Sequence, residues 1–170
     1  MKKLLLATVF MAALPFTISQ AAETASATLI NIEGAEIGKA HLKQGPNGVL
    51  IHVKVGGLTP GKHGLHLHSH GVCEGHEGFK TAKGHVGKVK GAHGLLNPSG
   101  PEAGDLPNIF IGADGNGEME AFTSLVSLKG NKNNLLDADG STFVIHEKAD
   151  DHITQPIGGA GARVACGIIK

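Results

Sequence analysis

The stretch Val49-Leu50-Ile51-His52-Val53-Lys54-Val55 decides the fold class, because an apolar residue recurs at every second position. Side chains alternate between the two faces of an extended strand, so this pattern predicts a strand with one buried face. Similar short runs occupy residues 25–33, 36–43, 118–128, 142–146 and 163–169, and turns rich in Gly and Asn separate them. Many short strands with such turns, and no helical period after the N-terminus, predict an all-β sandwich or barrel.

The N-terminus has the pattern of a secretory signal peptide. Lys2 and Lys3 precede a mostly apolar run that ends at Ile18, and Ser19-Gln20-Ala21 fits the small-x-small rule for cleavage. We therefore expect residues 1–21 to be removed and residues 22–170 to form one domain. The two-lysine start and the lack of other sorting features favour a bacterial protein that is periplasmic or secreted.

The charge balance limits the possible binding partners, and the cysteine content bears on a disulfide. Without Lys2 and Lys3, 13 basic side chains face 15 acidic ones, and no Lys/Arg run exceeds two residues, so we expect no nucleic-acid partner and, after cleavage, no membrane contact. Cys73 and Cys166 are the two cysteines of the chain. An even number in an exported protein favours a disulfide, and two free structural cysteines are the alternative.

A His-x-His pair, His66 and His68, suggests a metal site. In a strand both rings point to the same side, about 7 Å apart at the backbone, which lets both reach one ion through bonds of about 2 Å. The long irregular segments 69–107 and 147–162 follow, and the first contains many potential ligands, including His70, His76, His85 and His93. Loops of that length in a compact domain are usually functional or disordered, and this ligand content favours a loop organised by metal.

Several ordered motifs together resemble the copper/zinc superoxide dismutases over nearly the whole of residues 22–170. They are Gly64-Leu65-His66-Leu67-His68, Gly84-His85, His93-Gly94-Leu95-Leu96-Asn97-Pro98, Ala103-Gly104-Asp105-Leu106-Pro107-Asn108, His146-Glu147-Lys148-Ala149-Asp150-Asp151 and Gly161-Ala162-Arg163-Val164-Ala165-Cys166-Gly167. The resemblance implies an eight-stranded Greek-key β-barrel whose two long loops hold the metals.

The resemblance also implies a role for each matching residue, with one copper and one zinc per chain. The copper ligands would be His66, His68, His85 and His146, and the zinc ligands His85, His93 and Asp105. His85 would bridge the two metals, and Asp150 would hydrogen-bond one histidine of each. Arg163 would guide the anionic substrate, and Cys73 would pair with Cys166. Imidazole suits copper, and a carboxylate behind a ligand ring fixes its orientation.

Three positions depart from the family pattern. Glu102 stands where the third zinc histidine is expected, so it is either a zinc ligand or a solvated loop residue beside a weakened site. His70 or His76 could substitute for the missing ligand. Val86-Gly87-Lys88 replaces an aromatic-Asn/Asp-Pro run, and the segment after Asp150 carries little charge. The other histidines, His41, His52, His63, His70, His76 and His152, are expected to be ordinary surface residues.

The implied function is the disproportionation of superoxide to oxygen and hydrogen peroxide, with Arg163 positioning the anion and His85 delivering a proton. A non-catalytic periplasmic copper-binding module of the same fold is the alternative, and a structural domain without metals is a third. All four copper histidines and Arg163 are present, which favours the enzyme because a carrier does not need that arginine. The sequence is compatible with either a monomer or a homodimer.

Overall fold

The computed structural model describes residues 23–170, and the expected signal peptide lies outside them. Nine strands form one antiparallel sheet in the order β4-β6-β7-β3-β2-β1-β9-β8-β5. Their bounds are β1 Thr24–Asn31, β2 Glu36–Gly45, β3 Gly48–Val55, β4 Gly61–His63, β5 Leu65–His68, β6 Ile109–Ile111, β7 Gly117–Thr123, β8 Thr142–His146 and β9 Arg163–Ile168. Two short 3-10 helices, η1 Gly75–Glu77 and η2 Lys80–Ala82, lie in the first long loop. No helix in this part of the chain is long and apolar enough to span a membrane.

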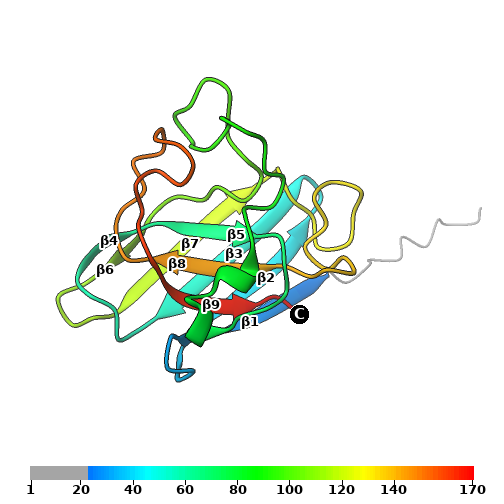
Figure 1. Cartoon of the computed structure of the whole chain (residues 1–170). Coiled ribbons are helices and arrows are strands. Elements are labelled where there is room, and N and C mark those ends of the chain that lie inside the picture. The colour runs from blue at the N-terminus through cyan, green and yellow to red at the C-terminus, as the bar shows by residue number, and fades with distance from the viewer. Residues whose placement is uncertain (1–22) are drawn as a thin grey trace, which may run out of the picture.

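The sheet curls into a nearly closed barrel (Figure 1). Its two outermost strands, β4 and β5, are consecutive in the chain and are separated only by Gly64. The peptide N–H of Gly64 donates to Lys148 O, and its carbonyl accepts from His146 N, so these groups pair with a loop and a neighbouring strand. This break accounts for nine strands where eight were expected. The all-β barrel itself is confirmed.

The alternating residues of β3 line the interior as predicted, with Val49, Ile51, Val53 and Val55 all buried. The strand predicted over 118–128 is shorter, because β7 ends at Thr123. Val126 and Leu128 beyond it are still buried, but the Leu128 N–H donates to the Gln44 side chain and not to a ladder. The prediction was wrong there because a buried apolar pattern continues where strand pairing stops.

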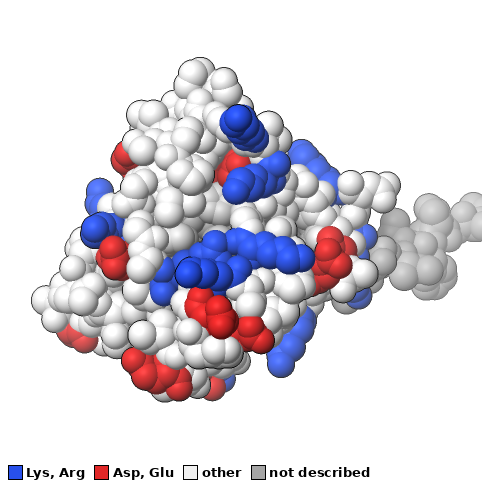
Figure 2. Space-filling model, in the orientation of Figure 1, with Lys and Arg blue, Asp and Glu red and all other residues white. Residues whose placement is uncertain are grey.

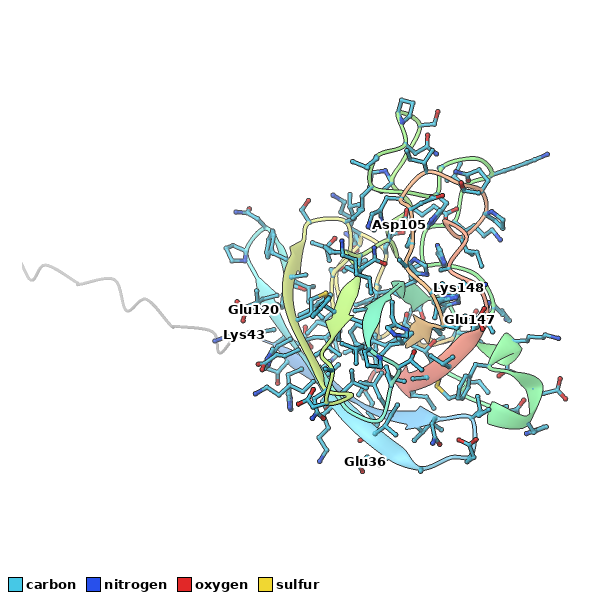
Figure 3. All side chains as sticks on the ribbon, turned by 90° about the vertical axis from the view of Figure 1, so that its left-hand side faces the viewer. Glu36, Lys43, Asp105, Glu120, Glu147 and Lys148 are labelled. Carbon is cyan, nitrogen blue, oxygen red and sulfur yellow. A yellow bond between two sulfur atoms is a disulfide. The ribbon has the colours of Figure 1, made fainter. Side chains whose placement is uncertain are left out.

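The two long loops rise from the same end of the barrel and contact each other (Figure 1). The Leu96 N–H donates to His152 O, and the His93 N–H donates to the Gln155 side chain. Figure 3 shows Asp105 in this loop region, away from Lys43 and Glu120 on the barrel wall. The candidate ligands therefore lie between β5 and the loops.

Candidate metal centre

Strand β5 is buried on both faces, and this double burial creates the site. Leu65 and Leu67 face the core, while His66 and His68 face the opposite side, where the loops cover them. Single β-bridges join His66 to Asp105 and His68 to His85. His146 ends the neighbouring strand β8. Backbone pairing thus brings histidines from distant parts of the chain to one place.

His66, His68 and His146 form the first ligand group, and each is at most 1% exposed. Each offers one ring nitrogen, and these atoms lie within 4.8 Å of one another. His66 Nδ1, His68 Nε2 and His146 Nε2 have no hydrogen-bond partner although they are buried. A buried polar atom without a partner is costly, so three such nitrogens close together fit a cation held between them.

The other nitrogen of each ring is held by the protein. His66 Nε2 donates to Asp150 Oδ2 at 2.7 Å. His68 Nδ1 donates to Lys83 O at 2.9 Å, and His146 Nδ1 donates to Gly161 O at 3.1 Å. Because the bonded nitrogen of each ring carries the proton, the nitrogens without a partner, His66 Nδ1, His68 Nε2 and His146 Nε2, are unprotonated.

Burial keeps these three rings neutral in the metal-free protein. Desolvation lowers the pKa of His66 to about 4, although its hydrogen bond to Asp150 opposes this. It also lowers the pKa of His146 to about 3 and that of His68 well below its usual value. Neutral imidazole is the form that binds metal, so the site is ready for a cation without first releasing protons.

His85 stands between this group and a second one. Its ring centre lies 4.3 Å from that of His66 and 4.9 Å from that of His68. On the other side, its Nδ1 lies 2.8 Å from Glu102 Oε2 and 3.1 Å from Asp105 Oδ1. His85 Nε2 is buried without a partner. The ring can therefore present one nitrogen to each of two ions, which is compatible with the bridging role that the resemblance implies.

The second group consists of His85, His93, Asp105 and Glu102. His93 Nδ1 lies 2.9 Å from Asp105 Oδ1, and Asp105 Oδ2 accepts the N–H groups of Gly94 and Glu102. Distance alone also groups His66 with His85, His93 and Asp105. We assign His66 to the first group because its Nε2 is already bonded to Asp150 and its free Nδ1 belongs to the first cluster.

Glu102 is 3% exposed, which overturns its interpretation as a solvated loop residue. Its Oε1 accepts the Val89 N–H at 3.0 Å, while Oε2 has no hydrogen-bond donor. Buried carboxylates are normally paired or coordinate a metal. The free oxygen therefore fits a cation between His85 and Asp105. His70 and His76 do not join this group, because His70 Nδ1 contacts Thr81 O and His76 is exposed.

Asp150 connects the two groups. Its carboxylate accepts from His66 Nε2 at 2.7 Å, from His93 Nε2 at 3.2 Å and from the His152 N–H at 2.6 Å. Burial would raise its pKa, but these hydrogen bonds hold the pKa well below the ordinary value. Burial likewise opposes the ionised form of Asp105, and contacts with His85 and His93 again lower its pKa. In the metal-free protein, the bonds to both carboxylates outweigh burial and raise the pKa of His93 to about 10.

Arg163 lies at the entrance to the first group and is held there by two hydrogen bonds. Its Nη1 and Nη2 donate to Phe79 O and Lys83 O, each at 2.6 Å. That segment is tied to β9 by the predicted Cys73–Cys166 disulfide, which is confirmed with a Cα–Cα distance of 5.7 Å.

A pocket at this entrance is lined by His68, His85 and Arg163 together with Lys80, Lys83 and Lys88. Figure 2 shows basic side chains gathered over the face where β5 and β9 lie. Residues 152–162 of the second loop contain no Lys, Arg, Asp or Glu, and the three lysines of the pocket come from the first loop.

One prediction about the other histidines was wrong. His63 was expected at the surface, but it is 3% exposed, with Nδ1 2.7 Å from His146 O and Nε2 2.8 Å from Thr59 O. The strand period contained the signal, because His63, Leu65 and Leu67 share one parity and therefore one face. His41 and His76 are exposed as predicted, and His52, His70 and His152 are partly exposed.

The chain is similar to proteins of one known family. The sequence profile of the copper/zinc superoxide dismutase family (SODC) matches residues 36–169. A Cu-Zn superoxide dismutase from Caulobacter vibrioides is 52% identical over 141 residues, which cover 81% of this chain and 80% of that protein. Superoxide dismutase [Cu-Zn] 1 of Aquifex aeolicus is 43% identical, covering 91% and 92%.

Among solved structures, a SOD-like protein from Bacillus subtilis superposes with a TM-score of 0.77 at 38% identity, covering 84% of this chain and 96% of that one. The family profile and these relatives show that the chain belongs to the copper/zinc superoxide dismutase family.

Proposed function

We propose that this chain is an exported bacterial superoxide dismutase, periplasmic or secreted, with copper held by His66, His68, His85 and His146. The observation that carries the proposal is the set of four buried ring nitrogens, one from each residue, that have no partner in the protein. Family membership supports the reaction, and the disulfide fits an oxidising compartment.

Bound copper supplies one-electron transfer, by which one superoxide is oxidised to oxygen and a second is reduced and takes up two protons to become hydrogen peroxide. The protein binds the anion and supplies a proton. Arg163, fixed by two backbone carbonyls, provides a permanent positive charge at the pocket. His85 lines the same pocket, and its Nε2 is the atom at which a proton can be held and released.

A second ion, which we propose to be zinc, would be held by His85, His93, Asp105 and Glu102. The donor set of nitrogen and carboxylate oxygen suits zinc. Through Asp150 this ion would be linked to His66, since that carboxylate bonds a ring from each group. Glu102 would complete this ligand set, and its buried Oε2, which accepts no hydrogen bond, supports that role.

Metal analysis of the mature protein, combined with a superoxide-decay assay, tests the function. We expect one copper and one zinc per chain and rapid decay of superoxide. A protein that binds copper stoichiometrically without accelerating the decay would instead be the copper-binding module, and the enzyme proposal would be wrong.

The role of Glu102 is tested by zinc retention. Glu102→Gln should lose zinc at a higher pH than the wild-type protein, because an amide is a weaker ligand than a carboxylate. Glu102→His should hold zinc to lower pH than Glu102→Gln, and Glu77→Gln, at an exposed glutamate, is the control. Equal zinc content of all four proteins across the acid titration would remove Glu102 from the ligand set.

A further inference from the structure

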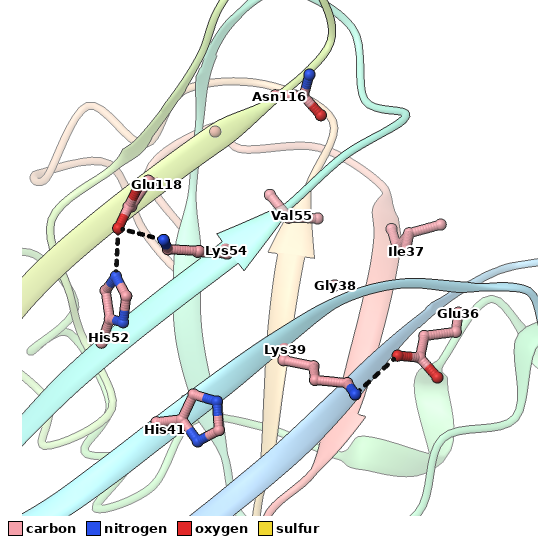
Figure 4. A pocket seen from close by; sticks show the side chains of 11 residues that line it. Glu36, Ile37, Gly38, Lys39, His41, His52, Lys54, Val55, Asn116 and Glu118 are labelled. Carbon is pink, nitrogen blue, oxygen red and sulfur yellow. Dashed lines mark hydrogen bonds and ion pairs between the residues drawn. The ribbon is translucent and has the colours of Figure 1, made fainter.

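Two histidines outside the buried centre lie side by side on the barrel wall. His41 of β2 and His52 of β3 are direct cross-strand partners, and both point away from the core (Figure 4). Side chains opposite each other in an antiparallel pair have Cβ atoms about 5 Å apart. Two imidazoles at that separation can both reach one ion through bonds of about 2 Å.

A carboxylate is already in contact with this pair. His52 Nε2 lies 2.5 Å from Glu118 Oε1 of β7, and Lys54 Nζ lies 3.1 Å from the same oxygen (Figure 4). His41, His52, Lys54 and Glu118 line one shallow groove across β2, β3 and β7. The hydrogen bond from His52, together with Lys54, lowers the pKa of Glu118. The Glu118 carboxylate is therefore ionised at neutral pH.

We propose that His41, His52 and Glu118 form a surface site for a divalent transition-metal ion, with copper(II) bound most tightly and zinc also accepted. Two imidazoles and one carboxylate are borderline ligands that favour these ions over calcium or magnesium. The site is separate from the buried centre, because its side chains leave the outer face of the sheet while the centre lies under the loops.

The site assembles as the ion binds. Among residues 23–170, the groups with three or more ligand atoms within 4.8 Å are both in the buried centre. His41 must therefore turn toward His52, which an exposed side chain does rapidly. An ion bound to Glu118 must displace the Lys54 ammonium, which lies 3.1 Å from that carboxylate, whereas Lys39 is already paired with Glu36 at 3.5 Å. We expect weaker binding than in the centre.

The test measures metal uptake by protein whose buried centre is already filled with copper and zinc. Zinc is then added in equilibrium dialysis, while the imidazole nitrogens are followed by ¹⁵N NMR. We expect one additional ion per chain and shifts confined to His41 and His52. His41→Ala and His52→Ala should each abolish this uptake. His76→Ala should keep it, because His76 is an exposed histidine beside one carboxylate, Glu77, at 3.8 Å.

The same experiment can overturn the proposal. Absence of the additional ion in the wild-type protein would do so, as would equal uptake by the His41→Ala/His52→Ala double variant. Both substitutions are on the outer face of the barrel, and a retained circular-dichroism spectrum shows that the variants are folded. Because the readout is metal content and not dismutase activity, failure here is distinct from failure of the proposed function.

Discussion

Removing the Cys73–Cys166 disulfide should cost this fold about 4–5 kcal/mol. The bridge closes a loop of 93 residues. In the chain-entropy account, a loop of that size removes about 4–5 kcal/mol of conformational freedom from the unfolded chain. For a domain of this length, that change lowers Tm by roughly 10–15 °C.

The loss should extend to activity, because the disulfide fixes the segment that holds Arg163. Phe79 and Ala82 pack with Val144 and Cys166 in a small buried cluster. The carbonyls of Phe79 and Lys83 accept the two guanidinium bonds of Arg163. Freeing Cys73 loosens this segment, so the arginine should be less well placed even where the barrel remains folded.

The assay compares urea unfolding of the metal-free protein in its oxidised and reduced forms, since bound metal would add its own stabilisation. Because the reduced wild-type protein keeps both sulfur atoms, its stability difference from the oxidised protein reports the loss of the cross-link and not a loss of side-chain packing. The dismutase activity is then measured on the Cys73→Ala/Cys166→Ala double variant, loaded with copper, at a temperature where the variant is folded. A stability difference below about 1 kcal/mol would refute the entropy argument. Unchanged turnover in the double variant would refute the link to Arg163.

Three further outcomes are expected. His146→Ala should lose copper and most activity, because one of four ligand nitrogens is removed; full activity would exclude His146 from the site, and His76→Ala is the control. Arg163→Glu should slow turnover strongly and change its salt dependence while copper stays bound, since the guanidinium acts on the anion; copper loss would show a structural role instead. The metal-free protein should lose at least about 1 kcal/mol of unfolding free energy between pH 7 and about pH 4, measured by urea denaturation. Burial lowers the pKa of His66 to about 4 and that of His146 to about 3, so the unfolded chain takes up protons first below its own value near 6.5. A flat stability profile would contradict this.

Residue periodicity predicted most of the barrel, because strands such as β3 and β8 bury alternate or all side chains over five residues or more. Strands β4 and β6 were not predicted. Each has three residues, which is too few for a period to stand out, and each exists because of its pairing: His63 lies opposite Ile109, and Gly61 lies opposite Ile111. The strand predicted over 118–128 was too long for the opposite reason. Residues beyond Thr123 remain buried, but burial alone does not require pairing with a neighbouring strand.

The position of Glu102 could be predicted from its motif, but its burial could not. From the sequence, Glu102 was interpreted as a zinc ligand, with a solvated loop residue as the alternative. The structure separates them through the contacts of the two oxygens, one held by the Val89 N–H and the other facing His85 without a donor. Such a distinction depends on the path of the loop, which no local pattern records.

The histidines of this chain also show what sequence alone cannot predict. His63 and His66 are three residues apart and both buried, yet only His66 has a nitrogen free of protein partners. Both nitrogens of His63 lie against backbone carbonyls, one of them that of His146, so His63 supports a ligand strand without being able to bind the ion. A buried imidazole is therefore a candidate ligand when one nitrogen is held and the other is left open. That criterion separates His66, His68 and His146 from His63, while His85 has both ring nitrogens without a hydrogen-bond partner, as a ring between two ions requires. It depends on tertiary contacts that the spacing of histidines does not specify.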